Sequence, residues 1–188
     1  MEEASTKITK LLILFIVVIA VIKQASMGGF FEAEDHKGRG YYVRIPEGWK
    51  KIKPPKDVVY PDDIEVVTFI PKATGLDPQE PEAYISIFTK KLASALWIED
   101  EIPEIRRSIS QAGNKILDQG QIKIDGVISE WTVYHDLKAP ALVLEFYMVT
   151  DSNIFYKLQY VAPPEKFNGL RRSFESLKES FKFRFSLY

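Results

Sequence analysis

An uninterrupted apolar run, LLILFIVVIAVI, fills residues 11–22 between Lys10 and Lys23 and constrains this chain more than any other segment. As a helix, twelve residues extend about 18 Å, which is short of the roughly 30 Å hydrocarbon layer of a membrane. A helix continued from Ile8 to Phe31 is long enough to cross if the two lysines reach toward the headgroups. The run therefore predicts a membrane-directed segment ahead of a separate folded part.

Three interpretations of this segment remain open. An uncleaved anchor is favoured, with Leu11, Leu12, Leu14, Phe15, Val18 and Ile22 as its membrane-contacting residues. A cleaved secretory signal is the second, because the length suits its apolar region and lysines precede it. However, Lys23-Gln24-Ala25 places a lysine where cleavage needs a small residue, and only Ser26-Met27-Gly28 roughly fits. A buried helix of a soluble protein is the third.

The lysines and arginines around the run do not decide its orientation. Lys7 and Lys10 precede it, whereas Lys23, Lys37 and Arg39 follow it within the distance that counts. A long folded domain is translocated largely regardless of charge, so we expect the domain outside. The expected location is the cytoplasmic (inner) membrane, crossed once, with the globular domain on the extracytoplasmic side.

The composition excludes several classes of protein. In 188 residues, 25 Lys and Arg almost balance 26 Asp and Glu, so the uniformly basic surface of a general nucleic-acid binder is absent. A hydrophobic content of 46% excludes a disordered tail. The chain has no cysteine and hence no disulfide, thiolate metal site, catalytic thiol or lipid-modified cysteine.

The whole chain divides into three parts. Residues 1–29 are the anchor or uncleaved signal, residues 30–40 are a polar, glycine-bearing linker, and residues 41–188 form one domain. Alternating or β-branched runs predict strands over 41–45, 64–70, 84–89, 115–124, 127–135, 141–150 and 154–161. Asp125-Gly126 predicts a tight hairpin turn. In 141–150 both faces are largely apolar, which indicates a sheet covered on both sides.

Two amphipathic helices are expected. Ile102, Ile105, Ile109 and Ala112 form one apolar stripe, with Pro103 in the first turn, Gly113 after the last turn, and Arg106 and Arg107 on the outer side. A second helix follows Pro163-Pro164 and turns Phe167, Leu170, Phe174, Leu177 and Phe181 toward the sheet. Hairpin strands with two separated helices predict an α+β domain with a mainly antiparallel sheet.

The segments YYVRIPEGWKKI (41–52) and FYKLQYVAPPEKFNGLRRSFESLKESFKF (155–183) resemble the PsbP-like family. The shared features are an aromatic strand running into Pro46-x-Gly48-Trp49, a strand ending in an alanine-proline step, and a last helix closing with Ser180-Phe181-x-Phe183. The resemblance implies a central antiparallel sheet with helices on both faces, with Gly48 in a turn and Trp49 in the core. It also implies a non-enzymatic accessory subunit or binding module outside the membrane.

The chain departs from that family in two respects. Cyanobacterial relatives are usually tethered through a lipidated cysteine, which is missing here. The metal-associated histidines proposed for some members have no matching motif, so the resemblance assigns no catalytic, cofactor or metal residue.

The two histidines are weak candidates for chemistry. His36 follows Glu32, Glu34 and Asp35, a set that could bind a divalent metal weakly, although a solvated linker is the simpler interpretation. His135 precedes Asp136 at a strand end, but no G-x-S-x-G elbow supplies a nucleophile, so a structural role is favoured.

Other charged groups have simple explanations too. Gly38-Arg39-Gly40 is only a fragment of a phosphate loop. Asp57, Asp62 and Asp63 lack the spacing of a calcium loop, and exposed turn acids are the better interpretation. Arg171, Arg172, Lys166 and Lys178 form a basic outer helix face, which is either simply solvated or meets anionic headgroups or an acidic partner.

We therefore expect a non-enzymatic, membrane-anchored accessory protein that binds a partner protein or membrane complex, with no cofactor and no nucleic acid. Partner contacts are expected on the anchor and on the loops around Pro71 to Pro81. A periplasmic domain that binds a small molecule or metal beside the sheet is the main alternative, and an envelope hydrolase a weaker one.

Overall fold

A computed structural model describes residues 35–52, 61, 63–72 and 81–184. The strands are β1 (Asp35–Gly38), β2 (Tyr41–Arg44), β3 (Trp49–Ile52), β4 (Ile64–Pro71), β5 (Tyr84–Lys91), β6 (Lys115–Ile124), β7 (Val127–Asp136), β8 (Ala141–Val149), β9 (Ile154–Ala162) and β10 (Lys182–Phe183). The helices are α2 (Ile98–Gln111) and α3 (Pro164–Ser180). The anchor residues Leu11, Leu12, Leu14, Phe15, Val18 and Ile22 lie outside the described residues, as do 73–80 of the loops expected to contact a partner. Neither described helix combines the length and apolar character needed to cross a membrane.

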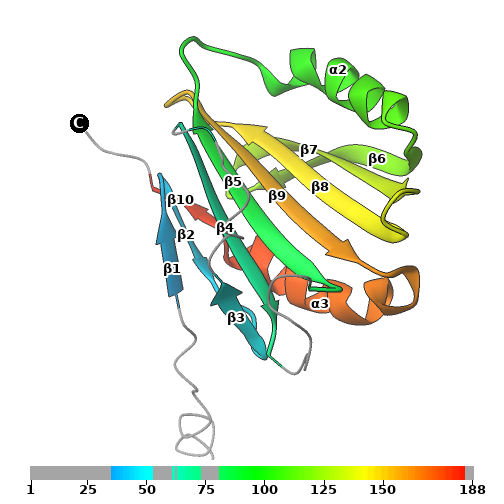
Figure 1. The fold of residues 1–188 in the computed structure, drawn as a ribbon. Coiled ribbons are helices and arrows are strands. Elements are labelled where there is room, and N and C mark those ends of the chain that lie inside the picture. The colour runs from blue at the N-terminus through cyan, green and yellow to red at the C-terminus, as the bar shows by residue number, and fades with distance from the viewer. Residues whose placement is uncertain (1–34, 53–60, 62, 73–80, 185–188) are drawn as a thin grey trace, which may run out of the picture. The chain divides into compact units, whose positions relative to one another are not determined.

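Seven strands form one antiparallel sheet in the order β3-β4-β5-β9-β8-β7-β6, and β1, β2 and β10 form a second, smaller sheet. Helices α2 and α3 lie on opposite sides of the larger sheet (Figure 1). The predicted α+β class and antiparallel sheet are confirmed. The small sheet was not predicted from the sequence. Its strand β1 lies within residues 30–40, for which a linker is predicted.

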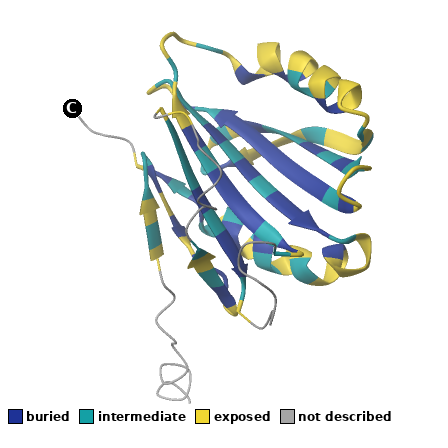
Figure 2. Cartoon of the chain, in the orientation of Figure 1, coloured by how far each residue is buried: buried dark blue, intermediate teal, exposed yellow. Residues whose placement is uncertain are grey.

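Strand β8 shows why both faces of the sheet are covered. Leu144, Phe146 and Met148 join the core beneath α3, whereas Val143 and Tyr147, which alternate with them, pack on the side of α2. Successive strand residues point to opposite faces, so this nine-residue strand contributes to two cores. The central strands are correspondingly buried, while the outer surfaces of both helices are exposed (Figure 2).

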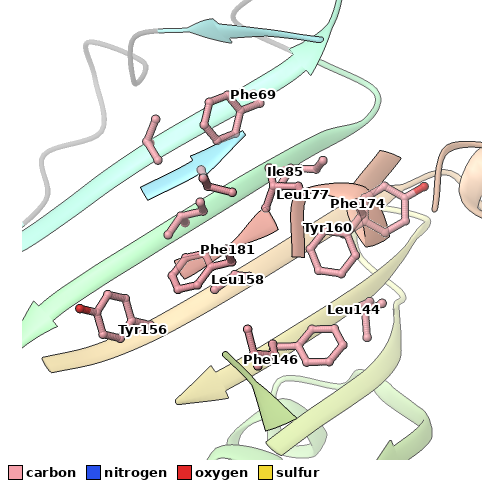
Figure 3. Packing of buried hydrophobic residues seen from close by; sticks show 14 of the residues in the cluster. Phe69, Ile85, Leu144, Phe146, Tyr156, Leu158, Tyr160, Phe174, Leu177 and Phe181 are labelled. Carbon is pink, nitrogen blue, oxygen red and sulfur yellow. The ribbon is translucent and has the colours of Figure 1, made fainter. Parts of the chain in front are cut away.

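Aromatic side chains dominate the larger core (Figure 3). Phe174 of α3 stacks on Tyr160 at 5.5 Å and meets Phe146 at 5.7 Å between ring centroids. The Tyr160 hydroxyl donates to the Phe167 carbonyl at 2.7 Å, so a buried polar atom is satisfied within the same cluster. The amphipathic stripe predicted for this helix is thereby confirmed.

The predicted turns also form. Asp125 and Gly126 have φ of 47° and 85°, which are the left-handed values that a tight hairpin requires. Gly113 has φ 89°, and the Asn114 amide donates to the Ile109 carbonyl at 3.2 Å, which closes the end of α2. Gly48 lies in a turn before Trp49, which is only 4% exposed, as the family resemblance implied.

Two expectations for α2 are wrong. The helix begins at Ile98, so Pro103 lies inside it and not in its first turn. Proline has no amide hydrogen, so Pro103 leaves the Glu99 carbonyl without its helical donor. This carbonyl lies in the exposed first turn, where water can replace the missing hydrogen bond. Arg106 does not face outward: its guanidinium donates to Glu130 and to the Trp131 carbonyl, both at 3.2 Å. Polar groups of β7 thus bind this charged side chain at the surface of the sheet.

Candidate functional site

The His36 ring lies between aromatic side chains and beside a lysine. The ring packs edge-on against Tyr41 and Phe69, at 5.8 and 5.9 Å, and the Lys51 ammonium donates to Nδ1 at 3.3 Å. Asp35 alternates with it along β1 and lies 3.9 Å from Arg44, and Glu32 and Glu34 lie outside the described residues. Among the residues described, no three His, Cys, Asp or Glu side chains are placed to hold a metal ion.

The surroundings of His36 predict a pH-dependent stability. Burial and the Lys51 ammonium lower the pKa of His36 below 6.5, against a smaller opposing effect of Glu65. The fold therefore favours the neutral ring, and this stabilisation is complete above the unfolded pKa of about 6.5 and is lost as the pH falls toward the lowered value. We expect the free energy of unfolding to decrease on acidification below about pH 6.5. Urea denaturation at several pH values measures it, with His36→Gln flattening the dependence and His135→Gln as the matched control. An unchanged slope in His36→Gln would contradict this account.

Three other candidates, Arg39, Asp63 and Asp136, bond to neighbouring parts of the fold. Arg39 lies in the turn between β1 and β2, where its amide donates to Glu65 and the Tyr156 hydroxyl donates to its carbonyl. Asp136 accepts the amides of Lys138 and Ala139 in the turn after β7. Asp63 pairs with Lys90 at 3.3 Å, and Asp57 and Asp62 lie outside the described residues.

The basic face of α3 is partly neutralised by its neighbours. Lys166 pairs with Glu82, and both Arg171 and Lys178 pair with Glu175. Only Arg172 of the four predicted basic residues lacks an acidic partner among the residues described. Glu82 and Glu175 together balance only two of these four positive charges, so about half of the positive charge of this face remains.

The structure offers a different surface at the start of α2. A hollow of about 610 Å³ lies among the segment leading into α2, the β6–β7 turn and the β8–β9 turn. Trp97, immediately before α2, lines this hollow with 74% of its surface exposed, and Ile128, which also lines it, is 38% exposed. Large exposed apolar side chains beside a hollow are typical of interaction sites. We call this the Trp97 hollow, lined by Leu96, Trp97, Glu99, Ile128, Val149 and Asp151 among others.

The Trp97 hollow is acidic. Glu99, Asp125 and Asp151 line it, and none of the described lining residues is a lysine or arginine. Asp125 is already engaged by the Lys182 ammonium at 2.8 Å and the Phe183 amide at 2.9 Å. Glu99 and Asp151 make no ion pair with any described residue, so their charges face solvent. The hollow combines apolar surface with free negative charge.

A second concavity, the α2 groove, lies between α2 and the sheet, with a volume of about 580 Å³. Its floor holds Glu145, which is only 4% exposed. The carboxylate accepts the Tyr147 hydroxyl, the Gln159 amide at 2.7 Å and the Lys157 ammonium at 3.1 Å. Lys157 also lies 4.3 Å from the centre of the Phe88 ring. A buried carboxylate is tolerated here because several donors converge on it.

Burial and the Glu145 carboxylate together raise the pKa of two neighbouring tyrosines. Burial, reinforced by the Glu145 carboxylate, raises the pKa of Tyr147 and of Tyr134 far above that of a free phenol. Both hydroxyls therefore stay protonated, and that of Tyr147 donates to the carboxylate. The groove has the size and mixed lining of a small-ligand site, but its central acid is fully used by the protein itself.

Sequence reasoning missed both concavities. A signal for Glu145 existed, since it is the one charged residue within the apolar strand ALVLEFYMV and a buried acid needs partners. No signal marked Trp97, because aromatic residues in this chain are mostly core residues and only the fold shows which one is left outside.

The fold matches solved structures over most of the chain. LpqN, involved in cell envelope biogenesis of Mycobacterium tuberculosis, superposes with a TM-score of 0.58 at 12% identity, over 83% of this chain and 87% of its own. The cyanobacterial PsbP (CyanoP) of Synechocystis sp. PCC 6803 gives 0.55 at 12% identity, over 82% and 95%. PA94 of Pseudomonas aeruginosa gives 0.55 at 11% identity, over 81% and 98%.

The domain has the PsbP-like fold. This confirms the resemblance drawn from residues 41–52 and 155–183. By sequence, no protein-family model and no curated protein matches this chain. At these identities the PsbP-like neighbours establish the architecture, and the chemistry of the site has to be argued from the side chains.

Proposed function

We propose that this chain is a non-enzymatic accessory protein, anchored in the cytoplasmic membrane by residues 11–22, whose PsbP-like domain binds a partner protein on the extracytoplasmic side. Trp97 carries the proposal, because a tryptophan 74% exposed beside an acidic hollow is a surface suited to another protein. The apolar run supports the anchor, and the PsbP-like fold agrees with an accessory role. LpqN, which has this fold, takes part in envelope biogenesis.

The anchor has a simple physical use in this proposal. Confining the domain to the membrane surface raises its effective concentration near a partner in the same membrane. Even a modest affinity at the Trp97 hollow then gives high occupancy of a membrane partner.

Detergent solubilisation and affinity purification test the proposal. The full-length chain is compared with one shortened to begin at Phe30. We expect the full-length chain in the membrane fraction together with a stoichiometric partner, and the shortened chain in the soluble fraction. A full-length chain in the soluble fraction contradicts the anchor, and failure of both forms to retain a partner contradicts partner binding.

The α2 groove favours a second candidate, a periplasmic small-molecule-binding domain. The supporting observation is a concavity of about 580 Å³ with converging polar groups around Glu145. Native mass spectrometry of the purified chain separates the two candidates. A bound small molecule of defined mass, lost on substitution of groove residues, supports the second.

A further inference from the structure

We propose that the Trp97 hollow docks a partner segment in which a bulky apolar side chain is flanked by lysine or arginine. This inference rests on the proposed function and names the chemistry of the partner. It commits to an apolar, basic polypeptide segment rather than an acidic segment or a lipid surface.

Several side chains that line the Trp97 hollow are apolar and at least partly exposed. Trp97 and Ile128 are exposed, Leu96 is half-buried, and Val149 contributes to the wall. Together they leave an apolar depression next to a flat indole ring. A partner side chain such as Leu, Ile, Met or Phe placed there removes apolar surface from water on both molecules.

The carboxylates at the hollow favour basic residues on either side of the partner's apolar side chain. Glu99 and Asp151 line the hollow without an ion-pair partner among the described residues, and Asp100 is exposed in the first turn of α2. An acidic partner segment is repelled by these carboxylates, whereas a lysine or arginine is attracted. Anionic headgroups are disfavoured for the same reason, so an anionic lipid surface is not the expected occupant.

The position of Trp97 supplies an independent argument. It is the N-cap residue of α2, with extended backbone angles (φ −95°, ψ 126°), and its side chain makes no capping hydrogen bond. Serine, threonine, aspartate and asparagine stabilise a helix at this position. An exposed tryptophan adds neither a cap nor buried surface, so the stability of the domain does not explain its presence. A contact with another molecule does.

This gives a variant that separates binding from folding. In Trp97→Ser the new hydroxyl can accept an amide of the first turn, so we expect an unfolding temperature no lower than that of the native chain. Loss of binding in a variant that is equally or more stable cannot be attributed to misfolding. Leu137→Ser is the matched control, because Leu137 is another exposed apolar residue (58%) in the turn after β7.

The test uses the full-length chain in detergent and a displayed library of random 12-residue peptides. We expect enriched peptides to combine one bulky apolar residue with lysine or arginine. For a synthetic peptide of that pattern, Trp97→Ser should weaken binding at least about tenfold, whereas Leu137→Ser should not. The double variant Glu99→Lys with Asp151→Lys should also weaken binding, and more strongly at low salt than at high salt. Enrichment of acidic peptides, equal binding by Trp97→Ser, or no enrichment overturns the inference. A membrane partner that co-purifies without depending on Trp97 refutes this docking site but still supports tethered binding of a partner through another surface.

Discussion

Replacing Glu145 with alanine is expected to lower the free energy of unfolding by about 3 kcal/mol. Glu145 is 4% exposed and accepts the Tyr147 hydroxyl, the Gln159 amide and the Lys157 ammonium. Removing the carboxylate leaves these donors in a largely dry space, and the Lys157 side chain, 25% exposed, keeps a charge without its partner. Losing a common acceptor is costlier than losing one hydrogen bond, because each donor was desolvated when the domain folded.

Glu145→Gln provides the control for this prediction. The amide keeps the size of the side chain and one acceptor oxygen but not the charge, so we expect about half the loss seen with alanine. Urea denaturation of the chain shortened to begin at Phe30, followed by far-ultraviolet circular dichroism, measures both variants. A loss below about 1 kcal/mol in Glu145→Ala would show that water replaces the carboxylate and that the network does not hold the domain together.

Phe174→Ala is expected to cost about 4 kcal/mol, because it removes a fully buried ring from the contact between α3 and the sheet. The cavity cannot collapse easily, since Phe174 lies between Tyr160 and Phe146, which are both held in strands. For a domain of this size, such a loss lowers the melting temperature by roughly 10 °C. Differential scanning calorimetry measures it.

Two comparisons make the Phe174 prediction specific. Phe174→Leu retains most of the apolar volume and should lose less than half as much stability. Leu137→Ala removes an exposed side chain and should change stability by no more than about 0.5 kcal/mol. If Phe174→Ala behaves like Leu137→Ala, α3 is not held to the sheet by this core.

The sequence allowed accurate prediction wherever local pattern and tertiary environment agree. The alternation in β8 and the spacing of Phe167, Phe174 and Leu177 in α3 each identify the buried face correctly. The Asp125-Gly126 hairpin was equally predictable, because few residues tolerate the required left-handed backbone.

Tertiary contacts explain the failures. Arg106 lies on the flank of an amphipathic helix, and only the position of Glu130 on β7 shows that it turns toward the sheet. Strand β1 is short and polar, and it forms because β2 offers a free edge for pairing. The Trp97 hollow is assembled from three segments distant in sequence, so no local pattern reveals it.

The most direct test of the central claim measures partner recovery from native membranes. The tagged full-length chain, Trp97→Ser and Leu137→Ser are solubilised in parallel, and the stoichiometry of the co-purified protein is determined by quantitative mass spectrometry. If the tethered domain binds through the Trp97 hollow, the native chain and Leu137→Ser recover a stoichiometric partner. Trp97→Ser then recovers at least about tenfold less of that partner. Equal recovery by all three chains would contradict it.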